Sequence, residues 1–66
     1  MSILKVIEIL ASSPTSWEEA TQSAVDEASK TVRNIRSANV QNMSTVVEGG
    51  KIKEFRVNCK IAFEVK

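Results

Sequence analysis

The sequence predicts a single α+β domain in which one helix lies across a three-stranded antiparallel sheet, in the order β-α-β-β. Three observations carry this prediction: an Ile-, Leu- and Val-rich run at 3–11, apolar positions spaced by three and four from residue 17 on, and strict apolar–polar alternation at 55–65. The chain has 66 residues, which leaves room for one domain only, so that domain is expected to span residues 1–66.

The first segment, ILKVIEILA at residues 3–11, predicts a strand that is apolar on both faces. A strand of this kind needs cover on both sides, and one helix can cover only one side. The sequence therefore predicts that copies of the chain associate. The two apolar faces consist of Ile3, Ile7 and Ile9 and of Leu4, Val6 and Leu10.

The second segment predicts a helix over residues 17–34. Ser16, with Glu19 three residues later, has the sequence of a capping box. Acidic residues in the first turn, and Lys30 and Arg33 near the end, match the helix macrodipole. The stripe expected to face the sheet is Trp17, Ala20, Ala24, Val25, Ala28, Val32 and Ile35.

The last thirty residues predict a hairpin, in which residues 37–48 form a strand, Gly49 and Gly50 form a tight turn, and the alternating strand from Phe55 follows. If no bulge intervenes, pairing of Glu48 with Lys51 fixes the register. The pairs that follow are Val40–Cys59, Ala38–Ile61 and Ser37–Ala62. The face under the helix is then expected to hold Ala38, Val40, Cys59 and Ile61, and the other face Ser37, Gln41, Met43, Arg56 and Asn58, with Phe55 and Phe63 in the core.

The composition excludes several classes of function. The chain contains no His, so Ser-His-Asp and Cys-His catalysis are ruled out. Tyr is absent as well, and a single Cys rules out the usual zinc sites and an intrachain disulfide. No pair of residues suggests acid–base catalysis. The sequence therefore predicts a protein that is not an enzyme.

The size, net charge and hydropathy of the chain limit the kinds of partner that it can have. A core of about 60 residues is marginal by itself, and no disulfide or metal is evident to stabilise it, which again favours an oligomer. Residues 1–32 carry a net charge of −3 and residues 33–66 one of +4. This asymmetry is too mild for nucleic-acid binding. With no membrane span or signal peptide in the sequence, we expect a soluble, cytoplasmic protein.

The sequence resembles the dodecins, which are small β-α-β-β flavin-binding proteins. The resemblance rests on the strand KVIEILASSP, the helix start SWEEA, the helix VDEASKTVRNI, the hairpin and the terminal IAFEV. It implies a hollow dodecamer of identical chains that holds small ligands between subunits. It also implies storage or buffering of flavin, as riboflavin or FMN.

Two positions depart from the dodecins that bind flavin. Their ring-stacking Trp falls in the segment NIRSANV, where this chain has Ser37, and their ring-edge Gln is matched by Arg56. Stacking on an aromatic side chain is worth about 1–3 kcal/mol per ring. We therefore expect flavin binding of reduced affinity near Ser37, Gln41 and Arg56. Gln41 and Asn42 fit either the polar edge of a ligand or solvated strand positions.

Geometry adds a condition to this ligand site. In the predicted register Ser37 lies six residues along the strand from Arg56, or about 20 Å at about 3.3 Å per residue. The two side chains are therefore expected to meet one small ligand only across a subunit boundary.

A rival interpretation is a structural assembly that holds no flavin. Symmetry would bring Glu8, Glu54 and Glu64 of several copies together as ligands for a hard cation such as calcium. Another small ligand, or no ligand at all, would also fit this interpretation.

Four further side chains have a structural interpretation beside a functional one. Trp17 is expected to pack rather than stack on a ligand, and Cys59 to be a buried small hydrophobe rather than a reactive thiol. Arg36 and Arg56 are expected to form ion pairs between subunits, with Glu54 or Glu64 as partner. Phosphate binding is the alternative for both arginines.

Overall fold

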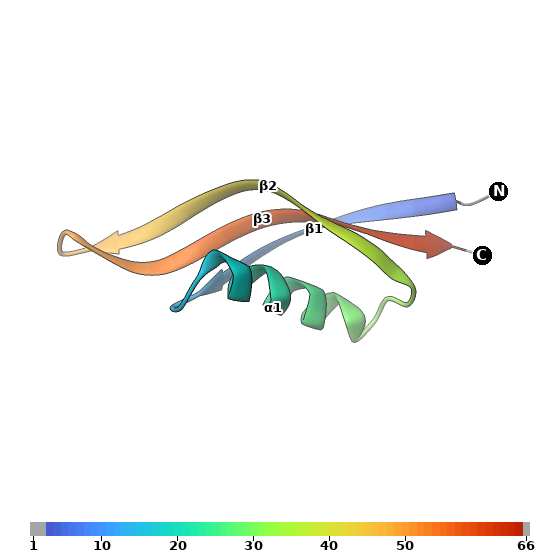
Figure 1. Ribbon diagram of the computed structural model, residues 1–66, viewed down its shortest axis with the longest axis horizontal. Helices are drawn as coiled ribbons and strands as arrows, with labels where there is room; N and C mark the ends of the chain where they lie inside the picture. The colour runs from blue at the N-terminus through green and yellow to red at the C-terminus, as the bar shows by residue number, and fades with distance from the viewer. Residues whose placement is uncertain (1–2, 66) are drawn as a thin grey trace.

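The computed structural model describes residues 3–65, which form three strands and one helix. The elements are β1 (Ile3–Ser13), α1 (Trp17–Ser29), β2 (Ile35–Glu48) and β3 (Lys51–Val65). The strands make one antiparallel sheet in the order β1-β3-β2, and α1 lies across one of its faces (Figure 1). The predicted fold class and element order are confirmed. Residues 1, 2 and 66 of the predicted domain lie outside the described residues.

The core lies between α1 and the central strand β3. Three alanines spaced by four residues place the small side chains of α1 against the sheet, so the helix can approach closely. They pack on Val57, Cys59 and Ile61, which are all 0% exposed. The predicted core positions Phe55 and Phe63 are only half-buried.

The start of α1 forms one of the two hydrogen bonds that define a capping box. Ser16 Oγ accepts a hydrogen bond from the backbone N–H of Glu19 at 3.0 Å. The Glu19 carboxylate accepts instead from Ser13 Oγ, at 2.7 Å. Ser13 Oγ also accepts from the backbone N–H of Thr15 at 3.0 Å, so this buried hydroxyl joins the end of β1 to the helix.

The helix ends at Ser29, so the prediction that it extends to residue 34 is wrong. The chain must reverse to place Ile35 opposite Phe63 in the sheet, and this reversal uses a left-handed backbone at Asn34, where φ is 62°. Asn34 then fixes the entry to β2, because its carbonyl accepts from the N–H of Glu64 at 3.0 Å. No helix within residues 3–65 combines the length and the apolar content needed to cross a membrane.

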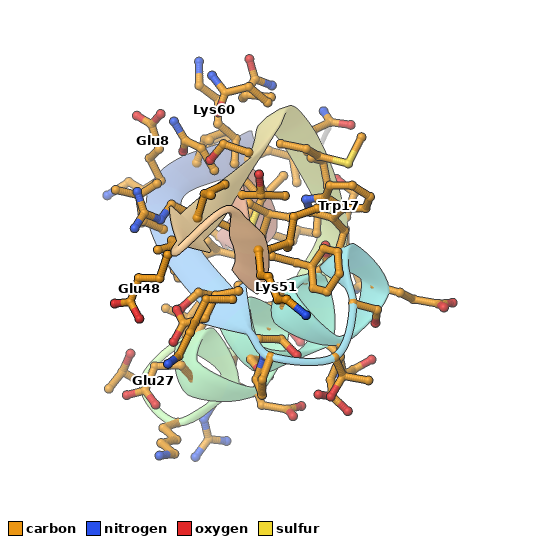
Figure 2. The ribbon with its side chains drawn as sticks, turned by 90° about the vertical axis from the view of Figure 1, so that its left-hand side faces the viewer. Glu8, Trp17, Glu27, Glu48, Lys51 and Lys60 are labelled. Atoms are coloured by element: carbon orange, nitrogen blue, oxygen red, sulfur yellow. The ribbon has the colours of Figure 1, made fainter. Side chains whose placement is uncertain are left out.

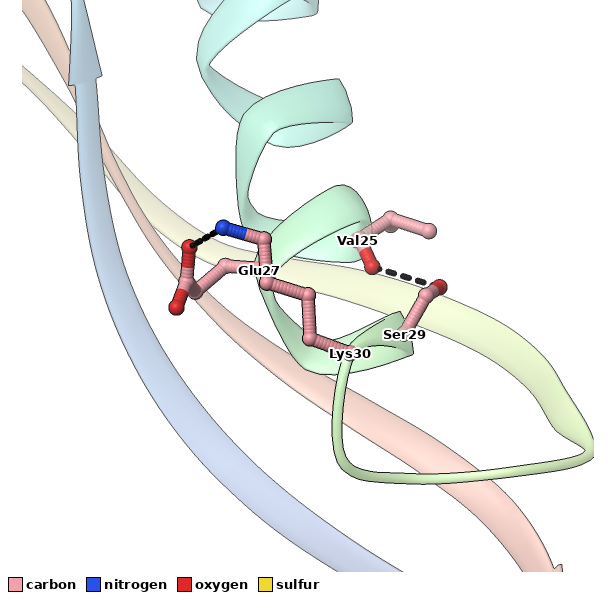
Figure 3. Close-up of polar contacts among 4 residues, drawn as sticks. All are labelled: Val25, Glu27, Ser29 and Lys30. Atoms are coloured by element: carbon pink, nitrogen blue, oxygen red, sulfur yellow. Dashed lines mark hydrogen bonds and ion pairs between the residues drawn. The ribbon is translucent and has the colours of Figure 1, made fainter.

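Local contacts close the last turn of α1 (Figure 3). Lys30 caps the helix and its Nζ lies 3.1 Å from the Glu27 carboxylate. Ser29 Oγ donates to the carbonyl of Val25 at 2.8 Å. Arg33 lies beyond the end of the helix, whose last turn contains no basic residue, contrary to the prediction from the macrodipole.

The predicted hairpin register is confirmed at both of its ends. Gly49 and Gly50 have φ values of +58° and +77°, the left-handed conformation that the turn requires. All four predicted pairs are present: Glu48–Lys51, Val40–Cys59, Ala38–Ile61 and Ser37–Ala62. Between these ends, however, Gln41 of β2 and Lys53 of β3 are each left without a cross-strand partner in the hairpin. Because each strand has one extra residue, the two shifts in register offset each other and the pairing beyond them returns to the predicted register.

The two bulges change which side chains share a face. Met43 lies opposite Val57 and is therefore on the helix side of the sheet, so its predicted place beside Arg56 is wrong. Asn42 lies opposite Asn58 on the face away from the helix. Gln41 sits in the bulge itself, where the alternation of faces breaks down.

Candidate functional site: the open face of the sheet

The sheet face opposite α1 is the candidate binding surface, and we call it the open face. Figure 2 shows Glu8 and Lys60 projecting from it, away from the helix. Leu10 on this face is 69% exposed, so the apolar character predicted for both sides of β1 has no cover here. The open face consists of the even-numbered residues of β1 from Leu4 to Ser12 and of β3 from Glu54 to Glu64, with Ser37, Asn39, Asn42, Ser44 and Val46 of β2.

Arg56 lies in a polar row that crosses the whole sheet. Its cross-strand neighbours are Ser12 on β1 and Ser44 on β2. Beside it is a cavity of about 230 Å³ lined by Leu10, Ala11, Ser12 and Arg56. Within residues 3–65 the guanidinium forms no ion pair or hydrogen bond. An unpaired guanidinium beside a cavity can bind an anion, a carbonyl edge or a group from another chain.

Ser37 and Gln41 are not brought to Arg56 within one copy. Ser37 is exposed on the open face opposite Ala62, and Ala62 is six residues along β3 from Arg56, or about 20 Å. Gln41 is exposed in the bulge between them. The separation expected from the sequence is therefore present, and a ligand that touches all three residues would need more than one copy.

Arg36 pairs with Glu64 inside the chain rather than between subunits. Its Nε and Nη2 lie 3.1 Å and 2.9 Å from Glu64 Oε1. This pair links β2 to β3 next to the irregularity between Ile35 and Ser37. The predicted partner Glu64 is correct, but the predicted location of the pair is wrong.

The three glutamates considered for calcium lie apart in one copy. Glu8 lies opposite Lys60, whereas Glu64 lies opposite Leu4 at the far end of the sheet from Glu54. No group of three or more His, Cys, Asp or Glu side chains within residues 3–65 could hold a metal ion. A calcium site built from these glutamates would need ligands from several copies.

Trp17 and Cys59 have the structural roles expected from the sequence. The Trp17 ring meets Phe55 edge-on, with centroids 5.0 Å apart and an interplanar angle of 74°. Trp17 Nε1 also donates to the carbonyl of Ser44 at 3.1 Å, which fixes the ring against the edge of β2. Cys59 is fully buried, and this desolvation raises the pKa of its thiol.

Asn58 has a feature that the sequence could not show. It lies on the open face between Leu10 and Asn42, and its Oδ1 is buried without a hydrogen-bond partner among the described residues. The alternation in β3 assigned Asn58 to this face. It carried no signal that the side chain would lack a partner.

These features define a small β-α-β-β protein whose candidate binding surface is the uncovered face of its sheet. The sequence model of the Dodecin family matches residues 3–66. The chain belongs to the dodecin family, whose members are small-ligand-binding proteins.

Relatives from two bacterial genera support the assignment. The chain is 36% identical to the calcium dodecin of Mycobacterium tuberculosis over 66 residues, which is 100% of this chain and 93% of that protein. The crystal structure of calcium dodecin from the same organism, described as having a novel calcium-binding site, aligns with a TM-score of 0.84 at 39% identity, covering 98% of this chain and 93% of that one. The dodecin of Streptomyces coelicolor aligns with a TM-score of 0.93 at 26% identity, again covering 98% and 93%.

Proposed function

We propose that this chain forms a homo-oligomeric shell, a dodecamer, that binds calcium ions at the junctions between copies and catalyses no reaction. The observation that carries the proposal is its 36% identity, along its whole length, to a relative named calcium dodecin. The aromatic side chain on which flavin-binding dodecins stack the ring is replaced here by Ser37. The proposal therefore favours a cation over a flavin as ligand.

The distribution of carboxylates is consistent with shared sites. Calcium takes six to eight oxygen ligands, and a single copy offers no cluster of carboxylates within residues 3–65. Glu64 is engaged by Arg36, whereas Glu8 and Glu54 form no ion pair or hydrogen bond within the described chain. These two carboxylates are the side chains that neighbouring copies could combine around an ion.

Isothermal titration calorimetry with calcium tests this proposal. After treatment with chelator and dialysis, the wild-type protein should bind calcium in preference to magnesium, because magnesium demands a smaller, stricter octahedron. Glu8→Gln should weaken binding at least tenfold. Glu27→Gln is the matched control, because Glu27 lies on the exposed side of α1 with Lys30. Absence of calcium binding by an oligomeric wild type would reject calcium as the ligand.

Weak flavin binding at Ser37, Gln41 and Arg56 is the second candidate function. It is favoured by the polar row of Ser12, Arg56 and Ser44 and by the cavity beside Arg56, whose guanidinium has no partner within residues 3–65. Riboflavin and FMN titrations, followed by quenching of flavin fluorescence, test it directly. Fluorescence that stays unchanged at high protein concentration would reject it.

A further inference from the structure

The cavity beside Arg56 combines a positive charge with an apolar wall. Its volume is about 230 Å³, and three of its four lining residues, Leu10, Ser12 and Arg56, belong to the open face. The apolar wall is Leu10, which is 69% exposed. Pockets for drug-sized ligands have volumes of about 300–1,000 Å³, so a molecule that fits here is smaller, about the size of a single aromatic ring.

The guanidinium of Arg56 is available to such a molecule. Within residues 3–65 it forms no ion pair or hydrogen bond, and Glu54, the next residue along β3 on this face, does not pair with it. The hydroxyl-bearing residues Ser12 and Ser44 flank Arg56 on the two neighbouring strands. A guanidinium binds a carboxylate or phosphate through two parallel hydrogen bonds, and hydroxyls can donate to the remaining oxygens. The row therefore suits an oxyanion better than a neutral group.

A second polar group close to the cavity lacks a partner. Asn58 Oδ1 is buried without a hydrogen-bond partner among the described residues, and Asn58 is the cross-strand neighbour of Leu10. Native structures retain few such acceptors, because each is destabilising. Since the χ2 torsion of Asn is broad, a small rotation can present this oxygen to a donor placed over Leu10. Asn58 lies two residues along β3 from Arg56, or about 7 Å.

We propose that this part of the open face binds a small organic anion. Its carboxylate or phosphate is held by Arg56, its apolar body lies on Leu10, and a hydroxyl or N–H at its other end donates to Asn58. This site goes beyond the proposed calcium binding, because it uses no carboxylate of the protein. It also differs from a flavin site, because the neutral flavin ring offers no oxyanion to Arg56 and the site does not involve Ser37 or Gln41.

Ligand-detected saturation-transfer NMR on the assembled wild type tests the site. The probe is 4-hydroxybenzoate, a single ring with a hydroxyl across from its carboxylate. Wild type should bind it at least about tenfold more tightly than the neutral 4-hydroxybenzamide, which cannot form the charge-assisted pair with Arg56. It should also bind it about threefold more tightly than benzoate, which has no hydroxyl to donate to Asn58.

Substitutions at the two ends of the site separate their contributions. Arg56→Gln should weaken binding of 4-hydroxybenzoate at least about tenfold, and Arg56→Lys should weaken it less, because an ammonium keeps the charge but not the planar fork. Asn58→Leu should abolish the difference between 4-hydroxybenzoate and benzoate and leave benzoate binding unchanged. Glu54→Gln should strengthen binding about twofold by removing a nearby negative charge.

Lys60→Gln is the matched control. Lys60 is an exposed cation on the same face of β3, opposite Glu8, but it does not line the cavity. Its loss should change the affinity for 4-hydroxybenzoate by less than about twofold, since attraction between exposed charges is weak at this range. Circular dichroism of each variant verifies that the chain still folds.

The outcomes decide the inference separately from the proposed function. Equal losses in Arg56→Gln and Lys60→Gln, or no binding of these anions by folded wild type, would overturn the site. Riboflavin that displaces 4-hydroxybenzoate at a lower concentration than benzoate does would overturn it too. Phenyl phosphate that binds more tightly than benzoate would support the site with phosphate as the head group, and the reverse order would support it with carboxylate. Calcium binding by Arg56→Gln should equal that of wild type, so failure of either proposal leaves the other standing.

Discussion

Replacing Ser37 by Trp should restore a stacking surface for flavin. Ser37 is exposed on the open face, and its cross-strand neighbour Ala62 is small enough to leave space for an indole ring. Stacking contributes about 1–3 kcal/mol per ring, which corresponds to about a 5- to 150-fold gain in affinity. Riboflavin fluorescence, titrated with wild type and with Ser37→Trp at equal concentrations, measures this gain directly.

Two variants control for side effects of the Trp substitution. Ser37→Leu adds apolar area without an aromatic ring and should gain much less affinity. Asn39→Trp places the ring two residues along β2, on the same face but opposite Lys60, and should gain little. If Ser37→Trp folds, assembles and binds riboflavin no better than wild type, the match of Ser37 to the ring-stacking position is wrong.

Three further predictions concern stability and the thiol. Ile61→Ala should lower the free energy of unfolding by about 2–5 kcal/mol and Ile61→Val by about 0.5–1.5 kcal/mol, because Ile61 is fully buried under α1. Urea unfolding measures both losses, and equal losses for the two variants would argue against a tightly packed site. Ser16→Ala should cost about 1 kcal/mol in thermal unfolding by removing the acceptor for Glu19 N–H, and an unchanged midpoint would show that the cap is dispensable. Burial holds the pKa of Cys59 above its ordinary value of 9.0, so the folded chain keeps this proton longer than the unfolded chain, and stability should fall as pH rises past about 9. Cys59→Ala should remove this decrease of stability with pH. In the wild type, the Cys59 thiol should be alkylated at neutral pH only when the whole chain unfolds.

Local sequence patterns were sufficient to predict most of the architecture. The alternation in β3 and the Gly49–Gly50 turn depend on side-chain periodicity and on backbone freedom, which are properties of neighbouring residues. The N-cap at Ser16 is equally local, although its partner Glu19 bonds to Ser13 rather than completing the capping box. The turn fixed the register next to it, and the pairs at the far end match the prediction because the bulges at Gln41 and Lys53 compensate each other.

The candidate site could be predicted only in outline. The sequence correctly assigned Ser37, Arg56 and Asn58 to one face and correctly predicted that Ser37 lies opposite Ala62, six residues along β3 from Arg56. It misplaced Met43, because the compensating bulges at Gln41 and Lys53 arise from how two long twisted strands accommodate each other. No pattern within either strand reports that accommodation.

The amino-acid sequence by itself determined the order of the elements, the helix start, the turn and the two-sided apolar character of β1. Tertiary structure decided where the helix stops, since the reversal at Asn34 serves the pairing of Ile35 with Phe63. It also decided that Arg36 pairs with Glu64 within the chain while Arg56 and Asn58 lack partners within residues 3–65. The physical reason is range: periodicity and capping act over a few residues, whereas hydrogen-bond and ion-pair partners are set by segments that are distant in sequence and meet only in the folded sheet.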